Sequence, residues 1–207
     1  MAETPLLVNE EISRAKFERE LAEYRQLEED HQKRGWWMLK AEYPEVFIVF
    51  ASSRLKPPAV IFGALIDFKN YDFWAPSVTL VNPFTRIPYK AKELPTLMKR
   101  LKPINPQTLP PGAENLPPEV IGQYFEQTQL LMAHSPDDVP FLCLPGVREY
   151  HQHPAHSGDS WLLHRTGGEG SLYFILDVLY RYGVQPIKSY NIQMIPAISF
   201  GQEMPQE

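Results

Sequence analysis

The stretch 64-ALIDFKNYDFWAPSVTL-80 decides the fold class. It begins inside an aliphatic run at residues 60–68 and ends in a second run at 77–81, with an aromatic turn between them that closes on Ala75-Pro76. Short aliphatic or β-branched runs bounded by turn residues are typical of strands. The turn is too short for the helical crossover that parallel strands need, so we expect these strands to pair in antiparallel fashion.

Two further strands are expected upstream, at residues 36–41 and 46–51, again joined by short connections. Four strands in such quick succession predict an antiparallel meander, because βαβ units would need longer links.

A long helix is expected before the meander, from Asn9 to about Gly35. Asn9 can cap its start, and a glycine is a common helix stop. The helical spacing predicts a buried apolar stripe of Ile12, Ala15, Phe17, Leu21, Tyr24 and Leu27. It predicts an exposed side with Arg14, Glu18, Arg25, Glu29 and Gln32.

The pattern of the sequence changes at about residues 90–140. A short helix is expected around Leu97 and Leu101, and the six prolines between Lys102 and Pro118 exclude a long helix or strand there. Helical spacing returns at residues 118–134.

The last expected helix covers Ser171–Tyr182 and ends at Gly183. Together these elements predict an α+β fold in one domain, residues 1–207, with a Pro-rich insertion at about 90–140.

Composition narrows the class of protein. The chain has 207 residues and a net charge of −5, which gives no basic field for nucleic acid. It lacks a run of roughly 18–20 apolar residues that could span a bilayer, and its start lacks the features of a signal peptide. A single cysteine, Cys143, excludes an internal disulfide and suits a reducing compartment. These features predict a cytoplasmic protein without nucleic-acid or membrane partners.

Two motifs resemble the ubiquitin-conjugating enzymes. The run 71-YDFWAPSVTL-80 is similar to that family's tyrosine–proline loop and fourth strand, and 141-FLCLPG-146 is similar to its active-site run. Trp161 precedes the last helix, as a tryptophan does in the family. The resemblance implies a ubiquitin-conjugating-enzyme-like arrangement: an N-terminal helix, a four-stranded antiparallel meander, a cysteine-bearing loop and a C-terminal crossing helix.

By the same resemblance, Cys143 is the catalytic thiol of a transferase in a bacterial ubiquitin-like conjugation pathway. It would receive the modifier from an activating enzyme as a thioester and pass it to a target protein. The N-terminal helix would contact the activating enzyme.

The chain departs from this family just before the cysteine. Where the family has His-Pro-Asn, whose asparagine stabilises the oxyanion, residues 134–138 read His-Ser-Pro-Asp-Asp. Asp137 or Asp138 could instead attract an incoming amine.

Histidines gather after Cys143. The run 148-REYHQHPAHSGD-159 carries three of the six histidines, and His164 lies beyond it. This run resembles a bacterial family of predicted metal-binding domains named for Cys, Glu, His and His. The resemblance implies a zinc site drawn from Cys143, Glu149, His151, His153 and His156, and thiolate and imidazole are ligands that zinc favours.

The residues leave three interpretations of the histidines open. They could form a solvated loop, support catalysis through His153 and His156, with cationic histidines or Arg148 lowering the pKa of Cys143, or bind a metal. A zinc-bound thiolate is a poor nucleophile, so the last two roles compete. The leading hypothesis is the conjugating enzyme, and the alternative is a metal-stabilised, non-catalytic adaptor of the same pathway. A thiol hydrolase that pairs Cys143 with His153 or His156 is a third possibility.

Overall fold

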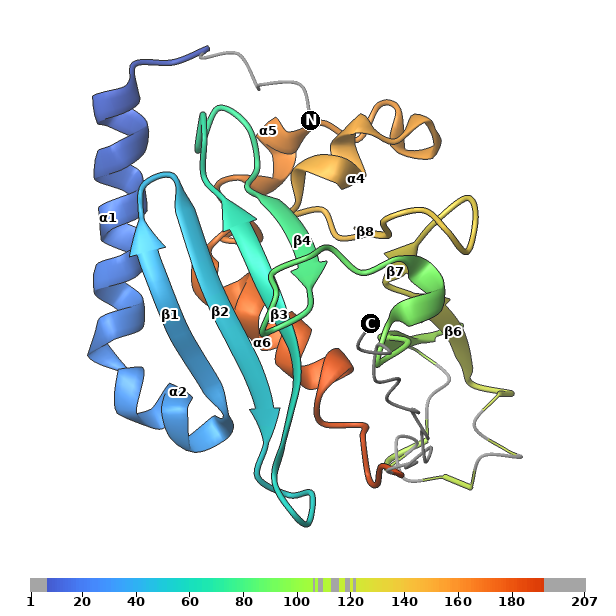
Figure 1. The fold of residues 1–207 in the computed structure, drawn as a ribbon. Coiled ribbons are helices and arrows are strands. Elements are labelled where there is room, and N and C mark those ends of the chain that lie inside the picture. The colour runs from blue at the N-terminus through green and yellow to red at the C-terminus, as the bar shows by residue number, and fades with distance from the viewer. Residues whose placement is uncertain are drawn as a thin grey trace, which may run out of the picture.

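A four-stranded antiparallel sheet forms the centre of the protein (Figure 1). The computed structural model describes residues 7–105, 107, 110–112, 116, 117, 120 and 122–191. The strands follow one another in the order β1 (Trp36–Glu42), β2 (Glu45–Ser52), β3 (Ala59–Asp67) and β4 (Ser77–Val81). The predicted meander is confirmed, because every neighbouring pair is antiparallel.

The register places one apolar row of the sheet towards the helices. Ile66 of β3 lies between Val46 of β2 and Val78 of β4, and all three are buried. Alternate side chains of a strand point to the same face, so one register decides which row enters the core. This row continues through Ile48, Phe50, Phe62 and Ala64.

Two helices complete the main core. Helix α6 (Leu172–Gly183) crosses the sheet, and α1 (Glu10–Gln26) runs beside β1 (Figure 1). The predicted last helix is thus confirmed to within a residue at each end. The predicted inward residues Phe17, Leu21 and Tyr24 are buried against this core.

A buried carboxylate ties the two helices together. Glu20 of α1 is 4% exposed and accepts hydrogen bonds from the Leu172 N–H at 3.0 Å and the Tyr71 hydroxyl at 3.1 Å. The Leu172 N–H belongs to the first turn of α6, where no intrahelical acceptor is available. Glu20 therefore caps α6 from another helix.

The single N-terminal helix expected from the sequence is wrong in two respects. The chain breaks at Leu27, and a second helix, α2 (Glu28–Arg34), follows at a different angle. Ile12 is 54% exposed and Leu27 49% exposed, and Ala15 is also exposed, so these residues do not widen the buried stripe. The predicted stop is confirmed: Gly35 has φ +94°, and a side chain there would collide with the Ala51 carbonyl.

The insertion contains strands where helices were expected. Strand β5 (Lys99–Pro103) pairs with β6 (Phe125–Gln129), and β7 (Leu131–Met132) pairs with β8 (Phe141–Leu142). The strands at Phe125–Gln129 and Leu131–Met132 therefore correct the helix prediction for most of the described part of 118–134, although Val120 is helical. These residues have helical spacing, but their backbone N–H and C=O groups pair with another strand instead. Tertiary context commonly decides the structure of such short segments.

The insertion is bonded directly to the cysteine loop. The Leu130 N–H donates to the Met98 carbonyl at 2.9 Å, and the Cys143 N–H donates to the Leu130 carbonyl at 2.7 Å. The position of Cys143 thus depends on the inserted hairpin.

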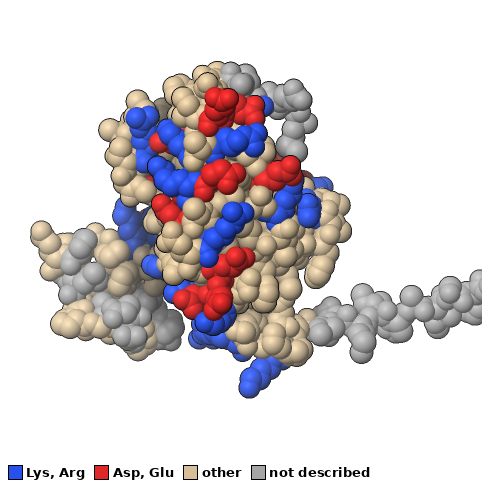
Figure 2. Space-filling model, turned by 90° about the vertical axis from the view of Figure 1, so that its left-hand side faces the viewer, with Lys and Arg blue, Asp and Glu red and all other residues tan. Residues whose placement is uncertain are grey.

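Charges of both signs are interspersed on the face that α1 presents (Figure 2). Arg14 pairs with Glu10 at 2.9 Å and Lys33 with Asp30 at 3.1 Å, all exposed. Among the described residues, no helix is long and apolar enough to cross a bilayer.

His31 is buried in an aromatic stack. Its ring lies 4.6 Å from that of Tyr24 and 4.8 Å from that of Trp36, and the side chain is 1% exposed. Neither ring nitrogen has a hydrogen-bond partner in the described part of the chain. Burial, reinforced by Arg34, lowers the pKa of His31.

This burial predicts an acid-sensitive fold. Below the ordinary histidine pKa of 6.5 the unfolded chain binds a proton that the folded chain does not, so stability falls as pH decreases through this region. His31→Phe should fill the stack and flatten the dependence. Urea unfolding at pH 7.5 and about pH 5.5 measures it, with the exposed His134→Phe as control. Equal pH dependence in wild type and His31→Phe would contradict the prediction.

Candidate functional site

Cys143 follows β8 and opens into a cavity of about 460 Å³. The thiol is partly exposed. The cavity walls come from two parts of the chain, the inserted hairpin and the histidine segment. Its polar lining residues include Arg100, Thr128, Gln129, Tyr150, His153 and His156.

A thiol–imidazole pair lies in this cavity. Cys143 Sγ is 3.3 Å from His156 Nε2. The His156 ring is held at the end of a short 3-10 turn, η4 (Pro154–His156), and stacks on Tyr150 at 3.8 Å between ring centroids. With the ring proton on Nδ1, Nε2 is free to accept the thiol proton.

The environment of Cys143 favours the thiol form of its side chain. Burial raises the pKa of Cys143 above its ordinary value, and the positive charge of Arg100 offsets only part of that rise. Attack at neutral pH therefore needs a base at the sulfur, because the thiolate fraction is small. His156 is placed for this role.

His153 lies on the same cavity wall with a different orientation. Its ring stacks on Phe141 at 5.0 Å and on His134 at 5.6 Å. Its Nδ1 accepts a hydrogen bond from the Ala155 N–H at 3.2 Å. In the neutral ring the proton is therefore on Nε2, which makes that atom a donor.

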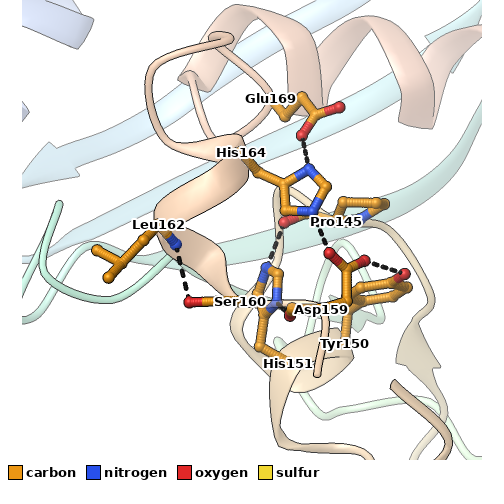
Figure 3. Close-up of polar contacts among 8 residues, drawn as sticks. All are labelled: Pro145, Tyr150, His151, Asp159, Ser160, Leu162, His164 and Glu169. Atoms are coloured by element: carbon orange, nitrogen blue, oxygen red, sulfur yellow. Dashed lines mark hydrogen bonds and ion pairs between the residues drawn. The ribbon is translucent and has the colours of Figure 1, made fainter. Parts of the chain in front are cut away.

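A second polar cluster is centred on Asp159 (Figure 3). Asp159 accepts from the Tyr150 hydroxyl at 2.7 Å and bonds His164 Nε2 at 2.6 Å, while Glu169 bonds the other nitrogen of His164. The bond to Asp159 raises the pKa of His164, and the bond from His164 lowers the pKa of Asp159. Asp159 thus fixes Tyr150, against which His156 stacks.

His151 points away from Cys143. Its nitrogens face the Asp159 carbonyl at 2.9 Å and the Pro145 carbonyl at 2.5 Å (Figure 3). The ring bridges the loop that follows the cysteine to the loop that carries Asp159, which is a structural role.

Two residues of α4 (Arg148–Gln152) dock the site on the sheet. The Arg148 guanidinium is 8% exposed and donates to the carbonyls of Ala75 at 3.2 Å and Lys69 at 2.7 Å. Glu149 bonds the Ser77 hydroxyl and lies 3.4 Å from the Val78 N–H. Burial raises the pKa of Glu149, and these hydrogen bonds oppose the rise.

A second cavity, of about 480 Å³, also has His156 in its wall. Phe73, Trp74 and Trp161 give it apolar walls, and Asp159 and Ser160 contribute polar atoms. His156 lines both cavities. A group bound in the second cavity could therefore reach the same imidazole.

The five residues expected to bind zinc do not come together. Cys143 and His156 are in contact, and His153 is near them, but Glu149 faces Ser77 and His151 faces two carbonyls. The described residues contain no group of three or more His, Cys, Asp or Glu side chains that could hold a metal ion. These residues do not fit a zinc ion as they are placed here, and the zinc site stays a prediction.

Arg148 and Asp137 are two further residues that the sequence predicted to act near the thiol. Arg148 does not approach the thiol, because it is buried under residues 67–75, and Arg100 acts on Cys143 in its place. Asp137 is exposed and pairs with Lys92 at 2.5 Å. The sequence analysis assigns no role to Arg100, because no local pattern signals that it lies near Cys143, nor to Tyr150 and Asp159, whose side-chain contact depends on the fold of the histidine segment.

Comparison with known proteins gives a family. The model of the Y4jH-like family matches residues 8–187. The chain is also 42% identical over 196 residues to the uncharacterized protein y4jH of Sinorhizobium fredii, and the match covers 92% of this chain and 91% of that protein.

The docking of α4 gives a stability prediction. Arg148→Lys should destabilise the fold by about 1–3 kcal/mol, because one ammonium cannot serve the separate acceptors of a guanidinium and leaves buried carbonyls unpaired. Urea unfolding measures the change. Arg165→Lys, at an exposed position, should stay within about 0.5 kcal/mol of wild type. Equal loss in both variants would remove the special role of Arg148.

Proposed function

This chain belongs to the Y4jH-like family, and we propose that it is a transferase of ubiquitin-like conjugation that carries the modifier as a thioester on Cys143. The observation that carries the proposal is the contact of 3.3 Å between Cys143 Sγ and His156 Nε2 at an open cavity. The order of helix, antiparallel meander, cysteine loop and crossing helix supports a ubiquitin-conjugating-enzyme-like fold.

The first step is attack on a thioester held by the activating enzyme. His156 Nε2 takes the thiol proton, sulfur forms a bond to the carbonyl carbon, and the carbonyl π electrons move to oxygen. The resulting oxyanion collapses and expels the thiolate of the activating enzyme, which receives the proton from His156. The modifier is now bound to Cys143 through its C-terminal carboxyl carbon.

The second step needs access for a target group. The attacking amine or hydroxyl must reach the thioester carbon on Cys143, so it would enter the cavity that Cys143 and His156 both line. His156 would then accept the proton of the attacking group, and Cys143 would leave as the thiolate and recover a proton. One imidazole can serve both half-reactions in turn, because it returns to its neutral form after each.

A thiol hydrolase is the second candidate, since it too requires a preformed cysteine–histidine pair. Such enzymes orient the histidine with a third polar group. In the described residues His156 has no carboxylate partner, and Asp159 is engaged by Tyr150 and His164. This arrangement favours transfer over hydrolysis. The metal-stabilised adaptor remains the non-catalytic alternative, and about one zinc per chain in chelator-free protein would support it.

Reconstitution with the activating enzyme and the modifier tests the transferase. Wild type should form an adduct that reducing agent removes, and Cys143→Ala should form none. His156→Gln should slow adduct formation by about 10²–10⁴-fold, the usual contribution of a general base. Arg165→Gln, at an exposed residue that does not line the Cys143 cavity, is the control and should load at the wild-type rate. Absence of any adduct on wild type with its cognate components rules out this function.

The exposed face of α1 is the proposed docking site of the activating enzyme. Arg14 and Arg25 are exposed, as the sequence predicted. Reversing both to Glu should slow the loading of Cys143 several-fold at low salt, with a smaller effect at high salt, because rim charges act mainly on association. Arg54→Glu, exposed beyond β2, is the control. Unchanged loading at low salt would leave α1 with a packing role alone.

A further inference from the structure

The backbone next to the thiol has no free donor for an oxyanion. The Cys143 N–H donates to the Leu130 carbonyl at 2.7 Å, and the Leu144 N–H donates to the Leu142 carbonyl at 3.0 Å. Residue 145 is a proline and has no N–H. A negative charge that develops on a carbonyl oxygen at Cys143 therefore finds no free N–H donor at residues 143–145, which leaves side chains on the cavity wall as candidate donors.

Arg100 is a candidate donor on the wall of the Cys143 cavity. It is half-buried, and its charge acts on the sulfur. No carboxylate in the described ranges forms an ion pair with it. A guanidinium with unused N–H groups beside a nucleophile is well suited to bind an anionic oxygen.

The β5–β6 hairpin fixes the position of Arg100. Arg100 is directly opposite Thr128, whose hydroxyl donates to the Arg100 carbonyl at 3.2 Å. Leu130, just beyond β6, accepts from the Cys143 N–H, so the hairpin and the cysteine are held in one register.

His153 supplies a second donor. Its Nδ1 already accepts from Ala155, so the proton of the neutral ring is on Nε2. Two flanking rings, Phe141 and His134, restrict its motion. It lines the same cavity as Arg100.

We propose that Arg100 and the Nε2–H of His153 form an anion subsite beside Cys143, which binds the oxyanion of the acyl-transfer intermediate. The inserted hairpin then completes the active site. The role in acyl transfer rests on the proposed function, whereas the subsite itself can be tested without it. Preorganised donors of this kind act most strongly where water is partly excluded.

Alkylation of the whole protein with two reagents tests the subsite. Iodoacetate is an anion and iodoacetamide is its neutral analogue, and both transfer a substituted methyl group to sulfur with loss of iodide. Both rates are proportional to the thiolate fraction of Cys143, so at one pH their ratio does not depend on that fraction. The ratio therefore reports how strongly the surroundings of the sulfur favour an anionic reagent.

Arg100→Gln should lower the iodoacetate-to-iodoacetamide ratio by at least about fivefold, because a nearby positive charge is lost. Arg100→Lys should retain most of the ratio. Lys102→Gln, two residues along the same strand and exposed, is the matched control and should keep the wild-type ratio. An unchanged ratio in Arg100→Gln, or an equal drop in Lys102→Gln, overturns the subsite.

A matched pair tests His153. His153→Phe keeps a stacking ring and removes the donor, so the ratio should fall about two- to threefold, less than for Arg100, because a neutral donor binds an anion more weakly. His153→Gln keeps an N–H donor and should stay closer to wild type. An unchanged ratio in His153→Phe overturns the part assigned to His153. Thermal melting of each variant confirms that it is folded.

Adduct formation then separates the two proposals. With the activating enzyme and modifier, Arg100→Gln should load Cys143 about 10²-fold more slowly than wild type, as expected when an oxyanion donor is removed. If the alkylation ratio depends on Arg100 but wild type forms no adduct, the subsite stands and the conjugating function fails. If Arg100→Gln loads at the wild-type rate, the oxyanion role is wrong.

Discussion

The buried guanidinium of Arg148 holds the candidate site on the sheet. It lies under the loop between β3 and β4 and donates to the carbonyls of Lys69 and Ala75, while the Arg148 N–H donates to the Pro76 carbonyl. Glu149 then bonds Ser77 at the start of β4. Buried polar groups of this kind are costly unless every partner is present, so the docking tolerates few alternative arrangements. The segment that carries Cys143 and His156 is therefore attached to the sheet through these hydrogen bonds.

The docking of this segment on the sheet suits a cysteine whose thiol form is favoured. Burial raises the pKa of Cys143, so in the proposed transfer the sulfur would depend on His156 at the moment of attack. A general base must stay within hydrogen-bond reach to be effective. Tyr150 packs on the His156 ring, and Asp159 fixes Tyr150, so the base is held from behind by a cluster that does not itself touch the sulfur.

The inserted hairpin also forms part of the candidate site. The Leu130 carbonyl, just beyond β6, accepts a hydrogen bond from the Cys143 N–H, so this N–H is not available to an oxyanion. Strand β5 of the same hairpin brings Arg100 to the cavity. The same hairpin therefore removes the Cys143 N–H as an oxyanion donor and supplies Arg100 as another. The departure from His-Pro-Asn at residues 134–138 is consistent with this arrangement, because the oxyanion would be bound from the other wall.

The sequence by itself determined the antiparallel meander, the last helix and the stop at Gly35, and it singled out the segment from Cys143 to His164 as the candidate site. These features depend on local periodicity, turn chemistry and residue type, which a linear reading contains. Only the tertiary structure decided that the first helix breaks at Leu27, that β5 and β6 replace two expected helices, and that His156 meets the thiol while His151 and Glu149 turn away. Strand pairing between residues far apart in sequence brings Arg100 to the cavity that Cys143 lines. Such pairing depends on register and on the entropy of closing long loops, which no local pattern records.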